Sequence, residues 1–124
     1  MKEQNLTVVL GASEKPFRYS NMAVRSLVNH GYPVMAVGVK EGKIDGVNIQ
    51  AGMPEPGGKV DTVTLYLSAK NQENLIDYIL ETLKPARIIF NPGAENPALE
   101  MKAKKLGIST ENACTLVLLS THQY

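Results

Sequence analysis

The sequence predicts an α/β protein with a three-layer, doubly wound, Rossmann-like fold around a mainly parallel sheet of five or six strands. Short apolar runs alternate with segments of helical apolar spacing along the 124 residues. This alternation is typical of a parallel sheet with helices on both faces. In addition, a glycine-bearing loop joins the first apolar run to the first helical pattern, which is the opening unit of many ligand-binding sheets of this kind.

The opening unit consists of a strand, a loop and a helix. Leu6–Leu10 is an apolar run that contains one threonine, Thr7, and predicts a buried strand. Ser20–His30 predicts a helix with Ser20 as its N-cap, and Gly31 stands where a C-terminal cap belongs. The helical spacing rests on Ala23, Val24, Leu27 and Val28.

The middle of the chain predicts two clear strands separated by an irregular stretch. Pro33–Val39 is the second strand and Val60–Leu67 the next clear one. Between them, residues 40–59 contain five glycines and two prolines, which favours irregular structure. One short strand is expected near Val47–Ile49.

The last part of the chain continues the alternation. Asn71–Leu83 predicts a helix, and Arg87–Phe90 a short strand. Asn96 is the expected N-cap of another helix, with proline at its first position, and Gly107 ends it. Ala113–Ser120 supplies the last expected strand, so residues 1–124 are expected to form a single domain.

Composition excludes several classes of protein. The chain is 44% hydrophobic and 20% charged, which is ordinary for a globular protein. A net charge of +1 gives no field that would attract nucleic acid or a membrane surface, so neither is expected as a partner. One cysteine, Cys114, excludes an internal disulfide and a cysteine-cluster metal site. No signal peptide or membrane span is recognisable, so we expect a cytoplasmic location.

The first loop has the features of a phosphate-binding site. The first N–H groups of a helix lack intrahelical partners, and the helix dipole adds partial positive charge at that end. Lys15 and Arg18 bring two cations to the same place. We therefore expect a nucleotide-like ligand here, with contacts from Gly11, Ala12, Ser13, Lys15, Pro16, Arg18 and Ser20.

Other contacts are expected from three further loops. Ligands of open parallel sheets bind at the carboxyl ends of the strands. This rule brings together the loops after Leu10, Val39, Leu67 and Phe90. The expected contacts in the last three of these loops are Val39, Lys40, Leu67, Ser68, Asn91, Pro92 and Gly93.

The residues narrow the type of nucleotide without deciding it. A dinucleotide fingerprint needs three glycines in the first loop and an acidic residue after the second strand. This chain has only Gly11 in the loop and Lys40 after the strand. A lysine there disfavours NAD and favours a second phosphate near the ribose, which leaves NADP and coenzyme A as candidates.

A series of motifs runs along nearly the whole chain in a characteristic order. Its segments are Gly11-Ala12-Ser13 with Pro16, Arg18 and Ser20, then Gly31–Val34, Lys40–Gly46, Met53–Glu55, Lys59–Asp61, Asn91–Asn96 and Leu106–Ile108. This order resembles the coenzyme A-binding domain family, small stand-alone bacterial proteins related to the N-terminal domain of the succinyl-CoA synthetase α subunit. The resemblance implies that the first loop and Lys40 contact the nucleotide end of coenzyme A, and that the loops after the third and fourth clear strands lie toward the pantetheine arm.

Three departures from the family pattern stand out. Pro56–Gly58 lengthens one loop, asparagine stands at Asn91 where the family often has glutamine, and Glu111–Cys114 replaces an Asp-Arg-Cys signature, so its arginine is missing. A vestigial Rossmann-like domain that acts as a protein-interaction module therefore stays open as an alternative.

The sequence favours binding without catalysis. No histidine stands in a candidate loop, no metal-ligand cluster is recognisable, and no nucleophile has an evident base. Coenzyme A or an acyl-CoA is the expected ligand, and an NADP-binding reductase or reductase subunit is the enzymatic alternative. The oligomeric state stays open between a monomer, a homodimer and a complex with a partner subunit.

Overall fold

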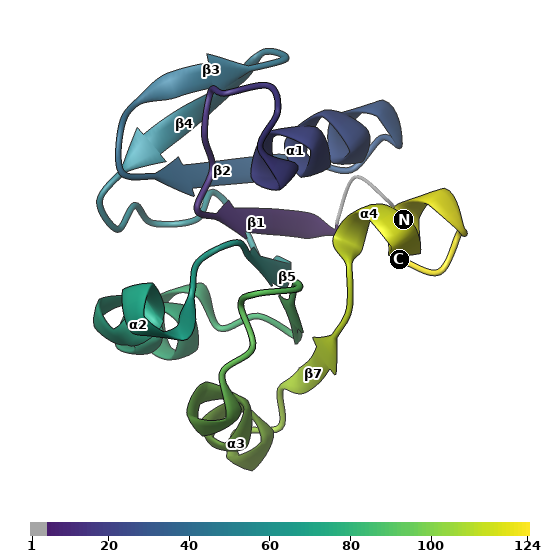
Figure 1. Ribbon diagram of the computed structural model, residues 1–124. Coiled ribbons are helices and arrows are strands. Elements are labelled where there is room, and N and C mark those ends of the chain that lie inside the picture. Colours follow the sequence, from purple (N-terminus) through teal and green to yellow (C-terminus); the bar gives the residue numbers. More distant parts are fainter. Residues whose placement is uncertain (1–4) are drawn as a thin grey trace.

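The computed structural model describes residues 5–124 and contains one seven-stranded sheet flanked by helices (Figure 1). The strand order is β3-β4-β2-β1-β5-β6-β7, and every neighbouring pair is parallel except β3 with β4. The α/β, doubly wound fold class is therefore confirmed, with seven strands instead of the five or six expected. The strands are β1 (Leu6–Leu10), β2 (Val34–Gly38), β3 (Gly42–Ile44), β4 (Val47–Ala51), β5 (Val60–Leu65), β6 (Arg87–Phe90) and β7 (Ser109–Asn112).

Helices cover both faces of the sheet. On one face, α1 (Tyr19–Asn29) and α4 (Thr115–Ser120) contribute Leu27 and Leu119 to one apolar cluster. On the other face, a helical stretch made of α2 (Ala69–Gln72), η2 (Glu73–Leu75) and the π-helix η3 (Tyr78–Leu83) lies beside α3 (Pro97–Lys105). The side chains of β1 alternate between the two clusters, as a strand in the middle of a sheet requires.

Residues 113–120 differ from the prediction. They were expected to form the last strand, but they lead into and form α4, and β7 precedes them. Thr115 and Leu119 are buried whereas Val117 is 54% exposed. Burial at i and i+4 is helical, but a short apolar run does not distinguish a buried strand from a helix. Strand β7 lies at the edge of the sheet and is polar throughout, so no apolar run in the sequence predicted it.

A second difference lies in the stretch expected to be irregular. It contains β3 and β4, which form a hairpin at one edge of the sheet. The short strand expected near Val47–Ile49 is confirmed as β4, whereas β3 was not expected. Asp45 and Gly46 have φ angles of +47° and +83°, the left-handed pair that a two-residue hairpin turn requires. An Asp-Gly pair is itself a hairpin signal, so this element was predictable from the sequence.

The last residue of the chain contacts the face of the sheet that α1 and α4 cover. The Tyr124 hydroxyl is hydrogen-bonded to the fully buried Thr7 hydroxyl on β1. The Arg87 guanidinium lies 4.5 Å from the centre of the Tyr124 ring, and Tyr32 makes an edge contact with the same ring. Tyr124 therefore holds the end of the chain against β1 and β6.

Candidate ligand site at the carboxyl edge of the sheet

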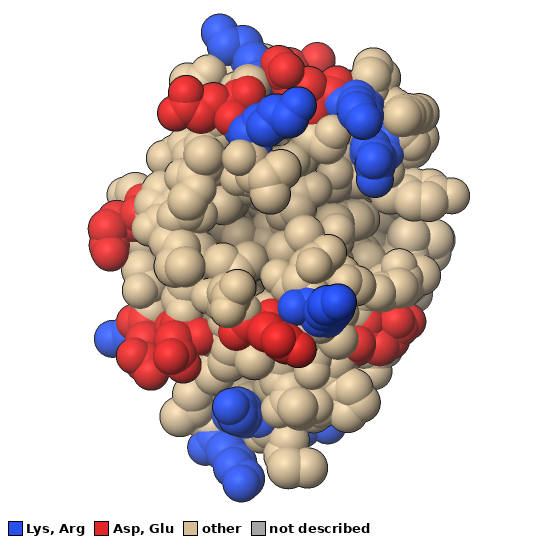
Figure 2. All heavy atoms as spheres, turned by 60° about the vertical axis from the view of Figure 1, so that its left-hand side comes forward, with Lys and Arg blue, Asp and Glu red and all other residues tan. Residues whose placement is uncertain are grey.

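The sheet places the four predicted loops next to one another. Strands β2, β1, β5 and β6 are consecutive neighbours and parallel, so the loops that follow them meet at one edge. The carboxyl ends of β1 and β2 lie at the left of Figure 1, and Figure 2 turns this side forward. Its centre is uncharged and hollowed, with acidic and basic side chains gathered above and below it (Figure 2).

The start of the first loop is fixed by its own backbone. The N–H groups of Gly11 and Ala12 both donate to the Val37 carbonyl, each at 2.9 Å. Gly11 has φ +96°, and a Cβ there would lie 2.8 Å from the Tyr66 carbonyl oxygen, so glycine is required. Both N–H groups are therefore occupied by β2, so Gly11 and Ala12 set the course of the loop. Backbone N–H groups that could donate to a ligand must come from later residues.

The N-terminus of α1 provides those donors. Its N-cap is Arg18, whose side chain makes no capping hydrogen bond. The first N–H groups of the helix, from Tyr19 onward, therefore have neither an intrahelical partner nor a side-chain cap. Ser20 was expected to be the N-cap; that prediction was wrong, because Ser20 lies within the first turn and is 4% exposed.

Two residues that the sequence analysis missed hold the loop against α1. The Asn21 side chain donates to the Ser13 carbonyl at 2.9 Å. Arg25, one turn later, donates to the Asn21 side-chain oxygen at 2.7 Å and to the Pro16 carbonyl at 3.1 Å. Their i, i+4 spacing was visible in the sequence, but only the fold shows that the loop returns over this face of the helix.

The cations expected near phosphate are available. Lys15, Arg18 and Lys40 are exposed, and none forms an ion pair within residues 5–124. The Arg18 guanidinium lies 5.9 Å from the Phe17 ring. Val39, beside Lys40, is 92% exposed. The end of β2 thus presents an unpaired lysine and an uncovered apolar side chain near the first loop.

Glu14 connects the first loop to the β3–β4 hairpin. Its carboxylate accepts a hydrogen bond from the Lys43 N–H at 2.9 Å. A Cβ on Gly42 would lie 2.4 Å from the Glu14 carboxyl carbon, so the side chain occupies the space that glycine leaves open. The negative charge of Glu14 is thereby held against the backbone of β3.

The loop after β6 is anchored by a buried asparagine. Asn91 is 2% exposed, and its amide donates to the Thr64 hydroxyl at 2.6 Å and the Leu65 carbonyl at 2.9 Å. Its side-chain oxygen accepts from the Thr115 N–H at 2.9 Å. Of the three residues expected to contact a ligand here, the side chain of Asn91 is therefore turned inward, and Pro92 and Gly93 face the solvent.

The loop after β5 leads directly into a helix. Ser68 is the N-cap of α2, and its hydroxyl accepts from the Asn71 N–H at 3.4 Å. Leu67 is half-buried and packs against the core on the α2 and α3 side. Both residues lie at the carboxyl edge, between the first loop and Asn91.

A buried tyrosine and a free thiol also lie near this edge. Tyr66 follows β5, and its buried hydroxyl has no hydrogen-bond partner within residues 5–124. Burial raises the pKa of Tyr66 to about 12 and outweighs the nearby Thr115 and Thr64 hydroxyls, which lower it. Cys114 is a half-buried free thiol at the N-cap of α4. Residues 5–124 contain no group of three His, Cys, Asp or Glu side chains placed to hold a metal ion.

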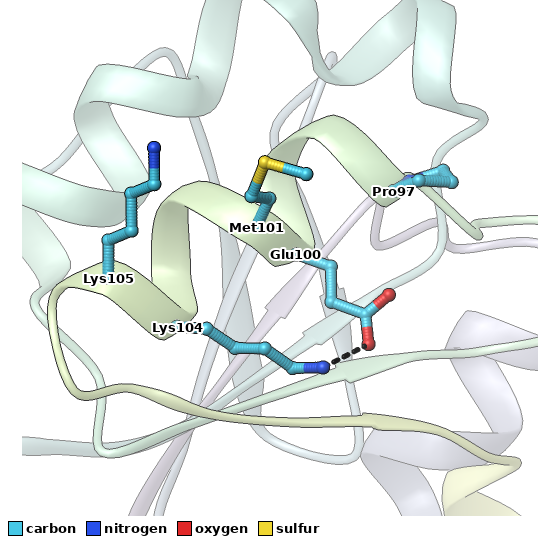
Figure 3. Close-up of a pocket in the computed structure, with 5 residues that line it drawn as sticks. All are labelled: Pro97, Glu100, Met101, Lys104 and Lys105. Atoms are coloured by element: carbon cyan, nitrogen blue, oxygen red, sulfur yellow. Dashed lines mark ion pairs between the residues drawn. The ribbon is translucent and has the colours of Figure 1, made fainter.

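The hollows found elsewhere on the surface do not include the predicted site residues. One, of about 490 Å³, lies along α3 and is lined by Pro97, Glu100, Met101, Lys104 and Lys105 (Figure 3). Lys104 pairs with Glu100 there at 3.3 Å. The other, of about 860 Å³, includes residues at the amino ends of β1, β2 and β4, such as Leu6, Val34 and Val47.

No helix described in the structure is long and apolar enough to cross a membrane.

Comparison with known proteins identifies the family. Residues 5–120 match the model of a family described as a CoA binding domain. The chain belongs to this family. A crystal structure of an uncharacterized protein is similar to this CoA binding domain at 42% identity, with a TM-score of 0.92 over 98% of each chain.

More distant structures share the fold. A protein from Thermus thermophilus is 22% identical, with a TM-score of 0.84 over 98% of this chain and 91% of its own. A dinucleotide-forming acetyl-coenzyme A synthetase from Ca. Korarchaeum cryptofilum, solved with phosphate and ADP, is 17% identical, with a TM-score of 0.70 over 90% of this chain and 26% of its own. No protein of curated function matches the chain.

Proposed function

We propose that this CoA binding domain binds coenzyme A or an acyl-CoA at the carboxyl edge of the sheet, without chemistry of its own. The observation that carries the proposal is a group of cations with no ion pair within residues 5–124: Lys15 and Arg18, just before the uncapped N-terminus of α1, and Lys40, after the neighbouring strand β2. Free N–H donors and mobile cations at a helix N-terminus suit phosphate groups. Family membership over residues 5–120 favours coenzyme A among phosphate-bearing ligands.

The proposed pose follows from the order of the strands. The diphosphate lies at the first turn of α1, within reach of Arg18 and Lys15, and the 3′-phosphate lies near Lys40 after β2. The pantetheine arm crosses the ends of β5 and β6, where Leu67, Ser68, Pro92 and Gly93 are uncharged. A neutral arm with two amides suits this uncharged part of the edge, because no charge is desolvated without a partner.

NADP is the second candidate, and Lys40 is the observation that favours it. A lysine after β2 suits a 2′-phosphate as well as a 3′-phosphate. An NADP-dependent reductase also needs a proton donor near the nicotinamide, and Tyr66 and Cys114, which lie near this edge, are buried or half-buried. Binding of coenzyme A therefore requires fewer protein groups than catalysis by an NADP-dependent reductase, because binding alone needs no proton donor.

A thermal-shift series tests the proposal. Coenzyme A, acetyl-CoA, NADP, NAD and AMP are compared at equal concentration. A ligand at a hundred times its Kd adds about 2.7 kcal/mol to the free energy of unfolding, which raises the Tm by roughly 10 °C in a domain of this size. We expect the largest shift with coenzyme A or acetyl-CoA. A clear shift with NAD alone contradicts the proposal, and no shift with any of the five supports an interaction module.

A further inference from the structure

The side-chain amide of Gln72, on α2, lies buried between two loops of the candidate site. Gln72 is 0% exposed. Its nitrogen donates to the Leu67 carbonyl at 2.7 Å and to the Ala94 carbonyl at 2.8 Å, and its oxygen accepts from the Asn96 amide at 2.8 Å. Leu67 follows β5, whereas Ala94 and Asn96 follow β6. One side chain therefore connects two loops more than twenty residues apart in the sequence.

The chemistry of these contacts requires an amide. The Leu67 and Ala94 carbonyls lie beyond the ends of their strands, and a buried carbonyl needs a donor. The glutamine amide offers two donors and an acceptor on one planar group, which matches two carbonyls and the Asn96 amide together. A leucine fills similar space and offers no donor. A glutamate offers a charge and, when ionised, no donor.

The loop after β6 is held from the other face of the sheet as well. Asn91 bonds to Thr64 and Leu65 on β5 and to the first turn of α4 through Thr115. The residues before and after Pro92-Gly93 are thus both fixed by buried amides. Pro92 and Gly93 remain exposed between them. The loop is presented to a ligand in one arrangement, which lowers the ordering cost of binding.

We infer that Gln72 is a positioning residue for the pantetheine arm of the ligand, an inference that rests on the proposed function. Neighbouring strands are about 4.8 Å apart, so the end of β6 lies roughly 10 Å from the end of β1 across β5. The phosphates at α1 do not reach that far. Gln72 therefore affects only ligands that extend past β5, and the nucleotide half alone is insensitive to it.

Calorimetric titration of Gln72→Leu with two probes tests this inference. The probes are coenzyme A and adenosine 3′,5′-bisphosphate, which lacks the pantetheine arm. We expect the Kd for coenzyme A to rise about tenfold and the Kd for the bisphosphate to change less than twofold. The control is Ile108→Ala. Ile108 is buried and stands just before β7, at the amino ends of the strands, whereas the candidate site lies at their carboxyl ends. This substitution lowers stability and leaves both dissociation constants unchanged.

Several outcomes overturn the inference. If Gln72→Leu weakens the binding of both probes equally, Gln72 has a general structural role. If the Kd for coenzyme A does not change, the loops after β5 and β6 do not contact the ligand. Equal affinity of the unmodified protein for both probes shows that the arm makes no contact. Failure of the unmodified protein to bind either probe refutes the proposed function itself, which is a separate result.

A milder variant covers the case in which Gln72→Leu does not fold. Asn96→Ser removes the amide that donates to the Gln72 oxygen, leaves both carbonyl contacts in place, and keeps a side-chain oxygen at the N-cap of α3. We expect a rise of about threefold in the Kd for coenzyme A and no change for the bisphosphate. An equal change for the two probes contradicts the inference here too.

Discussion

Substitution of Gly38 by alanine should lower stability and disturb the first loop together. Gly38 ends β2, and an added Cβ would lie 2.4 Å from the Ala12 carbonyl oxygen and 3.1 Å from a methyl group of Ile49. Real carbon–oxygen contacts lie well beyond 3 Å, so Ala12 must move by most of an ångström. The loop that begins at Ala12 must move with it.

The hydrogen bonds of Ala12 oppose that movement. The N–H groups of Gly11 and Ala12 both donate to the Val37 carbonyl, one residue before Gly38. Overpacking of this kind costs about 1–3 kcal/mol, and each weakened hydrogen bond adds about 0.5–1.5 kcal/mol. We therefore expect Gly38→Ala to lower the free energy of unfolding by about 2–6 kcal/mol.

Urea unfolding of Gly38→Ala beside Gly57→Ala measures this cost. Gly57 has no atom within 4 Å of an added Cβ and no positive φ, so the same chemical change there meets no obstacle. A glycine-to-alanine change at such a position stabilises by about 0.4–1 kcal/mol through the unfolded chain. If Gly38→Ala unfolds within 0.5 kcal/mol of the unmodified protein, the close approach of β2 to the first loop is not a constraint.

Three further predictions concern the site and its surroundings. Arg18→Ala should weaken coenzyme A binding by about 1.5–3 kcal/mol in a calorimetric titration. Urea unfolding should be unchanged, because the exposed guanidinium makes no contact with the core. A loss of stability with unchanged affinity for coenzyme A contradicts this role of Arg18. Coenzyme A should bind more tightly than dephospho-coenzyme A, which lacks the 3′-phosphate, and Lys40→Ala should reduce this difference in binding free energy by about 0.5–1.5 kcal/mol. If Lys40→Ala leaves the difference unchanged at low salt, Lys40 is not the partner of the 3′-phosphate. Stability should fall as the pH approaches and passes 10, because the raised pKa of Tyr66 means that the unfolded chain loses this proton first. At pH 11 the loss from Tyr66 is about 1.4 kcal/mol. Tyr66→Phe should abolish that part and cost nothing at pH 7.

The alternation of strands and helices and the position of the first loop could be predicted from the amino-acid sequence. Strands β1, β2, β5 and β6 lie where largely apolar runs predicted them, because strands covered on both faces are mostly apolar. Asn96 caps α3 as expected, since its side chain accepts from the Leu99 N–H. These features depend on a few neighbouring residues, so local chemistry is sufficient to predict them.

The tertiary structure decided the elements whose signals are weak or ambiguous. Residues 115–120 are apolar enough for a strand, but they form α4 because the polar strand β7 takes the edge position beside β6. Ser20 is a good N-cap by type, yet α1 begins one residue earlier, at Tyr19, with Arg18 as its cap. In both cases packing against the rest of the molecule outweighed a local preference.

The polar networks of the candidate site were also beyond the sequence alone. Gln72, Asn91 and Asn21 are polar residues with no distinctive spacing, and nothing local shows that they are buried or what they contact. Gln72 has its partners at Leu67, Ala94 and Asn96, and those partners meet only when β5 and β6 pair side by side. A local pattern predicts where a loop lies, whereas the pairing of strands decides which buried amide holds it, because hydrogen bonds form between groups that only the fold brings within 3 Å.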